Sequence, residues 1–505
     1  MNHSTQASFP KPLIWSLMLL AAAITFKSFN QLGSDYDLFW HLLMGEDMIK
    51  KGVIERFDIY SFTSFGHSVF NHEWLSEVIM TACYKLGGEW GIIFWRWIMT
   101  GLIVALAVHL ISLISKSGLN RIVIFLCFVL VLRPAVSFRV QLFTVVMLLV
   151  LLNFIYAAAI RDRLPKILWI GLLFVLWANL HGAFVLGLLV WFAYVGEYVL
   201  KERSVFGLKN VIAAALVPVL VTLVNPYGIK LWWFILSELS NPISSEYISE
   251  WQRFSFQPRE LAFFLVCLLS WAAYLKSGRE KRAAQTALLV LASVMGFSSV
   301  RHTPLFVVLC LPVMADHFDG VLLNIRGHVK DGKALSGIWI NFVAGVFVFF
   351  SVIFFTLGIP DTWQIDVEKD ELPFQLVHFI KTNQMKGNLF VPLHWGGYVL
   401  FHLYPEVKVS IDGRWAMIYP HDVMRDNMDF AYNGKDGKWK QILGTYKADY
   451  ALVETGNPAF FEMEGDPEWT FMVATPEGAL LVRKTFIESL PAPFVIPEKV
   501  LPSWP

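Results

Sequence analysis

Long apolar segments alternate with short polar ones over residues 1–359. Segments long enough to cross about 30 Å of hydrocarbon begin near Leu13, Gly91, Arg121, Gln141, Ile167, Ala183, Val211, Leu261, Ala283, Pro304 and Gly337. Each such segment predicts a membrane-spanning helix. The pattern therefore predicts a polytopic α-helical membrane bundle with about eleven transmembrane helices.

Basic residues gather in every second turn between these segments. They are Lys116, Arg121, Arg161, Arg163, Lys166, Lys201, Arg203, Lys209, Lys276, Arg279, Lys281, Arg282, Arg326, Lys330 and Lys333. The positive-inside rule places these turns, and the N-terminus with Lys11, in the cytoplasm. The loop after the first segment and the chain beyond about residue 360 are then expected outside.

The longest polar interruption in the first half is the loop of residues 31–90. Apolar residues recur at near-helical spacing from Leu38 to Ile49, which predicts an amphipathic helix in the membrane interface, and a second helix is expected from Asn71. Asp35 and Asp37 fall at or just before the first turn of the first helix. Carboxylates there are favoured by the helix dipole and can accept a proton or ligate a hard cation. The alternative is that Asp35, Asp37 and Asn71 only cap helices.

Near Pro360 the composition changes to that of a water-soluble domain. The expected elements are a helix over Phe374–Asn383, strands over Asn388–Pro392, Val407–Ile411 and Tyr450–Glu454, and a hairpin containing Phe471 and Ala479–Arg483. Helices between strands predict a small external α/β domain over residues 360–505.

Two motifs stand out in this domain. Trp395-Gly396-Gly397-Tyr398 has neither the dinucleotide-binding nor the P-loop spacing, so no nucleotide site is predicted. Asp412 and Arg414 either pair with each other or leave Arg414 facing an anionic ligand, and we favour the pairing.

Composition supports the membrane class. The chain has 505 residues, of which 56% are hydrophobic and 16% charged. Its net charge of +1 argues against a nucleic-acid partner. The four cysteines have neither a disulfide framework nor metal-ligand spacing. No cleavage pattern follows the first apolar stretch, so we expect it to remain as a signal anchor.

The predicted topology brings unusual polar residues from several turns to the same outer side as Asp35, His41, His72 and Glu73. They are Arg133, Arg139, His181, Glu250, Arg301 and His302. Ionisable residues at membrane edges are costly and usually functional when they converge. The three arginines could instead be snorkelling anchors, and Asn225-Pro226-Tyr227-Gly228 could be only a turn.

The order of these features resembles the GT-C superfamily of polyprenyl-phosphate-dependent integral-membrane glycosyltransferases. The resemblance rests on a short first helix, a loop that opens with Asp35-Tyr36-Asp37, two juxtamembrane helices, a many-crossing bundle and an external C-terminal domain. The segments WANLHGAFVLGL, NPYG, RHTPLF, WGGYVLFHLYP and IDGR are similar to a group of bacterial GT-C-like membrane proteins. The similarity covers nearly the whole chain.

The resemblance implies roles for particular residues. An acidic residue of the first external loop is the base for the acceptor, and some members use a divalent metal such as Mg²⁺ or Mn²⁺; both roles match Asp35 and Asp37. Basic residues on the same side hold the lipid-linked phosphate, for which the candidates are Arg133, Arg139 and Arg301. His41, His72 and Glu73 belong to the subgroup's own pattern, so no general GT-C role carries over to them; from their place in the loop, His72 and Glu73 are expected at the catalytic centre. The remaining candidates for substrate binding are His41, His181, Glu250 and His302.

We therefore expect a glycosyltransferase that acts on the outer face of a bacterial cytoplasmic membrane, in surface-glycan assembly or glycoconjugate modification. Its partners would be a polyprenyl-phosphate-linked sugar, membrane lipid, and a glycan, lipid or protein acceptor. The alternative is a non-catalytic lipid-glycan transporter or an assembly subunit of an envelope machine. A transporter would more naturally carry charges at mid-membrane depth, so their predicted convergence at one face favours the enzyme.

Overall fold

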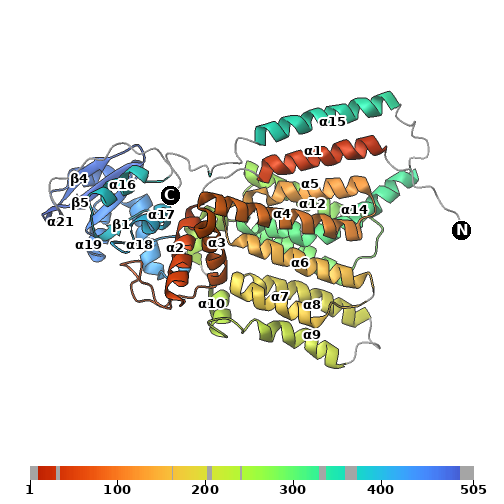
Figure 1. Cartoon of the computed structure of the whole chain (residues 1–505), viewed down its shortest axis with the longest axis horizontal. Coiled ribbons are helices and arrows are strands. Elements are labelled where there is room, and N and C mark those ends of the chain that lie inside the picture. The colour runs from red at the N-terminus through yellow and green to blue at the C-terminus, as the bar shows by residue number, and fades with distance from the viewer. Residues whose placement is uncertain are drawn as a thin grey trace.

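The computed structural model describes residues 10–29, 35–161, 163–201, 208–238, 242–328, 337–358, 365 and 372–488. It consists of a bundle of apolar helices and a smaller α/β domain formed by the C-terminal part of the chain (Figure 1). Helices α2 and α3 lie between the two. The predicted domain boundary near Pro360 and the basic residues Arg203, Lys330 and Lys333 lie outside the described residues.

All the predicted apolar segments form helices, because an apolar run can satisfy its backbone groups only within a helix or a closed sheet. These helices are α1 (Lys11–Phe29), α4 (Glu89–Ile114), α5 (Gly118–Leu132), α6 (Gln141–Ala159), α7 (Ile167–Leu180), α8 (Phe184–Lys201), α9 (Leu208–Val221), α12 (Leu261–Lys276), α13 (Ala283–Ser298), α14 (Thr303–His328) and α15 (Gly337–Gly358). Of the described helices, six are long and apolar enough to cross a membrane, and α7, α9, α12 and α13 are shorter apolar helices of 14 to 16 residues.

Helix α6 forms much of the centre of the bundle. It packs against α4, α7, α8 and α14, while α1 and α15 pair with each other at one edge (Figure 1). The outward faces remain apolar, with exposed side chains such as Leu102, Leu168 and Val294. Contact with lipid tails favours exposed leucine and valine side chains on long helices.

Helices α2 (Tyr36–Lys51) and α3 (Trp74–Gly87) confirm the two predicted helices of the opening loop. Asp35 is the N-cap of α2, and its side chain accepts the N–H of Asp37. The prediction of Asn71 as the N-cap of α3 is wrong, because Glu73 occupies that position. Asn71 instead accepts the N–H of Glu73 with its side chain and so turns the chain into the helix.

Short helices complete the α2–α3 end of the bundle. They are η1 (Arg133–Ala135), α10 (Lys230–Glu238), α11 (Pro242–Tyr247), η2 (Ser249–Trp251), η3 (Pro258–Glu260) and η4 (Val300–His302). Each lies in a connection between two helices of the bundle. These connections carry five of the polar residues expected at the site: Arg133, Arg139, Glu250, Arg301 and His302.

The C-terminal domain is a five-stranded mixed sheet with helices, as predicted. The strands are β1 (Gly387–Phe390), β2 (Val407–Val409), β3 (Tyr450–Glu454), β4 (Trp469–Ala474) and β5 (Gly478–Arg483), in the order β2-β1-β3-β5-β4. β1 is parallel to β2 and β3, whereas β5 is antiparallel to β3 and β4. The helical elements are α16 (Phe374–Thr382), α17 (Leu393–Leu403), η6 (Trp415–Met417), α18 (His421–Asn433), α19 (Lys438–Thr445), α20 (Phe460–Glu464) and α21 (Lys484–Ile487).

The C-terminal domain shares its hydrophobic core with α2. Phe39 and Trp40 are buried together with residues of α16, α17 and the sheet. Close approach is possible because Gly397 and Gly413 have no side chain: a Cβ atom on Gly397 would lie 2.9 Å from the Tyr36 carbonyl oxygen, and one on Gly413 would lie 2.2 Å from Asp37 Oδ1. The start of α2 is therefore fixed by the C-terminal domain as well as by the bundle.

Candidate functional site

Side chains from many separate segments meet at the end of the bundle that carries α2 and α3. One group joins Asp35 to Arg139, Glu250 and Arg301. A second group contains histidines and glutamates from α2, α3 and the turn after α7, and its members are His41, His72, Glu73, Glu77 and His181. We call the first the arginine–carboxylate group and the second the histidine–glutamate cluster.

Arg139, just before α6, links two carboxylates. Its Nε donates to Asp35 Oδ2, and its Nη1 lies 2.6 Å and 2.7 Å from the two carboxylate oxygens of Glu250. Burial opposes the charge, but Asp35 and Glu250 together raise the pKa of Arg139, which keeps it cationic. The sequence predicted Arg139 as a phosphate ligand, whereas here its fork is already occupied by protein carboxylates.

Asp37 lies beside this group in a half-buried position. Its Oδ1 accepts the indole N–H of Trp40 at 3.1 Å and faces the backbone at Gly413. Burial, and then the negative charge of Asp35, raise the pKa of Asp37 above its usual value. A carboxylate with a raised pKa is better suited to accept a proton than one held by a cation.

Arg301 is more open than Arg139. Its guanidinium lies 5.0 Å from the centroid of the Trp251 ring, and its Nη1 is 3.7 Å from Glu250 Oε2. His302 contacts the same Trp251 ring edge-on. Arg133 lies in η1, with an exposed side chain. A partly exposed guanidinium over an indole ring suits an anionic ligand.

Glu73 is the centre of the histidine–glutamate cluster. Its Oε1 lies 3.4 Å from His72 Nε2 and 3.3 Å from His181 Nε2. The His181 Nδ1 accepts the N–H of Ala183, so the proton of the neutral ring sits on Nε2, the ring nitrogen nearer to Glu73. Burial lowers the pKa of His181 to about 4. Burial would raise the pKa of Glu73, but the nearby histidines, first His72 and then His181 and His41, together outweigh burial and lower that pKa.

His41 and Glu77 form the other half of this cluster. His41 Nδ1 lies 3.2 Å from Glu77 Oε1, and the Asn71 amide donates to Glu77 Oε2 at 2.6 Å. Burial opposes protonation of His41, yet the hydrogen bond with Glu77 raises the His41 pKa. Burial also raises the pKa of Glu77. Both side chains are almost fully buried.

Asp35 and Asp37 do not fit the divalent cation that the resemblance implies. Both oxygens of Asp35 are engaged, Oδ1 by the Asp37 N–H and Oδ2 by Arg139. A cation would have to displace the guanidinium from a buried ion pair, which is strongly unfavourable. We therefore derive no step through Mg²⁺ or Mn²⁺ at these two aspartates.

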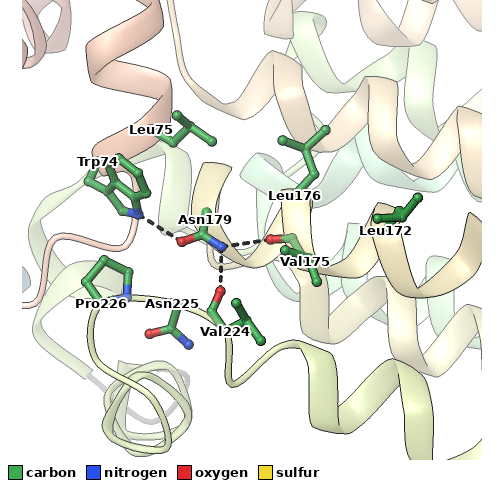
Figure 2. Close-up of a pocket in the computed structure, with 9 residues that line it drawn as sticks. All are labelled: Trp74, Leu75, Leu172, Val175, Leu176, Asn179, Val224, Asn225 and Pro226. Carbon is green, nitrogen blue, oxygen red and sulfur yellow. Dashed lines mark hydrogen bonds between the residues drawn. The ribbon is translucent and has the colours of Figure 1, made fainter. Parts of the chain in front are cut away.

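An apolar groove opens on the side of the bundle next to Glu73 and His181. It has a volume of about 740 Å³ and is lined by Trp74, Leu75, Leu172, Val175, Leu176, Asn179, Val224, Asn225 and Pro226. Figure 2 shows the Asn179 amide joining its walls: it accepts from the Trp74 indole and donates to the carbonyl groups of Val175 and Val224. Leu172 and Leu176 are largely exposed, so the groove opens on the lipid-facing side of α7.

Glu77 was not among the residues expected at the site. Glu73 and Glu77 lie at the start of α3, which packs against α2, and both are buried. The adjacent His72 and the four-residue spacing of the two glutamates were the available signals.

The chain matches no protein-family model, and no curated protein matches it. The geometry of the site thus carries the functional argument.

Proposed function

We propose that the protein is a membrane glycosyltransferase that takes its sugar from a polyprenyl phosphate. The observation that carries the proposal is Asp37: a carboxylate with a raised pKa, set beside the arginine–carboxylate group at one end of a membrane-type helix bundle. Transfer to a hydroxyl needs such a proton acceptor together with cations near the leaving phosphate.

In the proposed reaction the acceptor hydroxyl oxygen attacks the anomeric carbon of the donor sugar. Its proton passes to the Asp37 carboxylate, and the bond from the anomeric carbon to the phosphate oxygen breaks, leaving its electron pair on the phosphate. Arg301 is the arginine best suited to hold that phosphate, because it is partly exposed and Arg139 is occupied by two carboxylates. Arg139 positions the start of α2, and with it Asp37.

The apolar groove is proposed to hold the isoprenoid chain of the donor. Its apolar side chains would face lipid, and its lining residues Trp74 and Asn179 lie one and two positions from Glu73 and His181 in the chain, so a bound isoprenoid chain would end near these ionisable residues. A volume of about 740 Å³ accommodates a few isoprene units and leaves the rest of a long chain in the bilayer.

The proposed topology has eleven crossings in a bacterial cytoplasmic membrane, with the C-terminal domain and the site outside. It rests on the alternation of basic turns in the sequence. A cysteine introduced at Asn433 should react with a membrane-impermeant maleimide in outer-membrane-permeabilised cells, and one at the exposed Glu280 should not. The reverse pattern would overturn the orientation.

Mass spectrometry of lipid-linked sugars and surface glycans tests the activity. A deletion strain should accumulate the lipid-linked donor and lack one glycan, and the wild-type gene should restore it. Asp37→Asn should fail to restore it at normal protein abundance. Glu46→Gln, on the same helix but paired among the described residues with Lys50 and Lys85, should succeed. An unchanged profile in the deletion strain would favour the transporter or assembly-subunit alternative.

A further inference from the structure

We propose that His41, Glu73 and Glu77 form a binding site for one divalent transition-metal ion, such as Zn²⁺ or Mn²⁺. This site is separate from Asp35 and Asp37 and does not depend on the proposed glycosyltransferase activity. One nitrogen from α2 and two carboxylate oxygens from the start of α3 would be its ligands, with His72 and His181 as neighbouring groups.

The distances in the cluster suit a shared cation. One potential ligand atom from each of His41, Glu73 and Glu77 lies within 4.8 Å of the other two. Two atoms that each lie about 2.1 Å from a tetrahedral metal are about 3.4 Å apart. The His41–Glu77 pair already has this spacing at 3.2 Å. Only a small movement of Glu73 would bring its oxygen to the same centre.

The helices hold these ligands in place. Glu73 and Glu77 are four residues apart at the start of α3 and therefore lie on one face of it. Helices α2 and α3 pack so closely at this point that a Cβ atom on Gly45 would lie 2.5 Å from the Glu77 carbonyl oxygen. His41, one turn before Gly45, thus faces the glutamates from a short distance. A site with ligands on two packed helices is more rigid than one on loops.

Neighbouring groups orient the ligands in the way that metal sites require. The Asn71 amide nitrogen donates to Glu77 Oε2, and its oxygen accepts the Glu73 N–H, so one side chain fixes both glutamates. The Asn71 backbone N–H in turn donates to the Tyr227 hydroxyl. His181 Nε2 lies 3.3 Å from Glu73 Oε1. Hydrogen bonds of this kind to ligand carboxylates tune and orient metal centres.

Charge and ligand type define the class of ion. Two buried carboxylates carry a charge of −2, which a divalent ion balances. The arginines Arg139 and Arg301 pair with Asp35 and Glu250, while the recorded partners of Glu73 and Glu77 are histidines and Asn71. Imidazole nitrogen with carboxylate oxygen favours Zn²⁺, Fe²⁺ or Mn²⁺, and Mg²⁺ prefers oxygen alone. Protons on His41 and His72 are the competing way to balance the same charge.

His72 and His181 are the more accessible part of the cluster. The side chains of His72 and His181 are 18% and 13% exposed, whereas His41 is 2% and Glu77 is 0% exposed. The two outer histidines therefore stand between solvent and the buried ligands, where they can capture an ion or complete its coordination.

Metal binding to the full-length protein in detergent tests the proposal. After removal of metals with a chelator, the protein is equilibrated with Zn²⁺ or with Mn²⁺, and the metal retained per chain is measured along with the affinity. We expect about one ion per chain. Glu73→Gln and Glu77→Gln should weaken binding at least tenfold, because amide oxygens are poorer ligands, and the metal should raise the Tm of the wild type but not of these variants.

Control variants make the outcome specific. Glu46→Gln on the exposed part of α2 and Asp37→Asn beside the other group should bind the metal as the wild type does. His41→Gln, which removes the nitrogen ligand, serves if a glutamate variant does not fold. The proposal is overturned if the wild type retains neither metal, if the folded variants of the three ligands bind normally, or if Asp37→Asn abolishes binding. Loss of metal binding with an unchanged glycan profile would leave the site standing without the glycosyltransferase.

Discussion

The guanidinium of Arg414 lies 2.7 Å from the carboxylate of Asp58, a residue 356 positions earlier in the chain. Arg414 also pairs with Asp412, so the pairing favoured from the sequence is confirmed, and Asp58 is a second carboxylate partner. All three side chains are buried, and the ring of Tyr60 lies 4.8 Å from the guanidinium. This group joins the loop of residues 31–90 to the C-terminal domain and thereby fixes one side of α2.

Asp58→Asn should destabilise this junction strongly. The change leaves Arg414 with one carboxylate in a buried site, where loss of one partner of an ion pair costs about 3–5 kcal/mol. We expect a lower Tm and faster proteolysis within residues 52–70. Glu406→Gln, which breaks an exposed pair with Lys386, is the matched control, because such pairs contribute about 0–1 kcal/mol. Equal Tm values for the two variants would contradict the role assigned to Asp58.

The helices and strands followed from the sequence because their physical causes are local. Apolar runs must form helices if they contact lipid, and strand segments such as Tyr450–Glu454 carry their own β-forming residues. Helix α17 did not follow, although its Gly396 and Gly397 stood out. These glycines allow close tertiary packing, because a Cβ on Gly396 would lie 2.0 Å from the Ile411 carbonyl oxygen.

From the sequence, the site was predictable only as a set of residues on the outer side of the predicted bundle. Topology alone brought Asp35, Arg139 and Glu250 together, and the structure joins them in one ion-paired group. The topology did not indicate that Arg139 would pair with two carboxylates, because the second pair depends on how η2, which carries Glu250, packs on the bundle. Burial of Glu77 also depends on packing of α2 over α3, which periodicity within one helix does not encode.

Gly45→Ala should separate α2 from α3. A methyl group there would lie 2.2 Å from the Thr81 hydroxyl and 2.5 Å from the Glu77 carbonyl oxygen. We expect a loss of about 1–3 kcal/mol, the usual range for overpacking, seen as a fall in Tm. Gly101→Ala in α4 is the control, because nothing lies within 4 Å of its Cβ position. It should be neutral or slightly stabilising, since alanine favours helix.

Lysine replacements should distinguish the two arginines of the site. Arg139→Lys has one ammonium for two carboxylates on different elements, so we expect a loss of about 2 kcal/mol of stability and reduced abundance. Arg301→Lys should keep abundance while transfer falls roughly tenfold, equivalent to one charge-assisted hydrogen bond of about 1.5 kcal/mol. Complementation and protein level in the deletion strain give both readouts. The exposed Arg253→Lys is the control, and full activity of Arg301→Lys would remove Arg301 from the phosphate site.

Replacing Asp35 with asparagine should give a different defect from replacing Asp37 with asparagine. At position 35 it can still cap α2, because Asn and Asp cap about equally well. It loses the charge opposite Arg139, however, and leaves that guanidinium with Glu250 alone. We therefore expect Asp35→Asn to lower the Tm and the abundance of the protein, with activity falling in proportion to abundance.

Asp37→Asn should instead give a folded, normally abundant and inactive protein. The asparagine oxygen can still accept the indole N–H of Trp40, so the contact that positions the side chain survives. The ability to take a proton is lost, and the usual contribution of a general base is about a hundredfold or more in rate. Complementation of the deletion strain, normalised to protein level, measures the effect against Glu46→Gln. Full complementation by Asp37→Asn would show that its carboxylate serves the fold alone, and the glycosyltransferase proposal would lose the residue on which it rests.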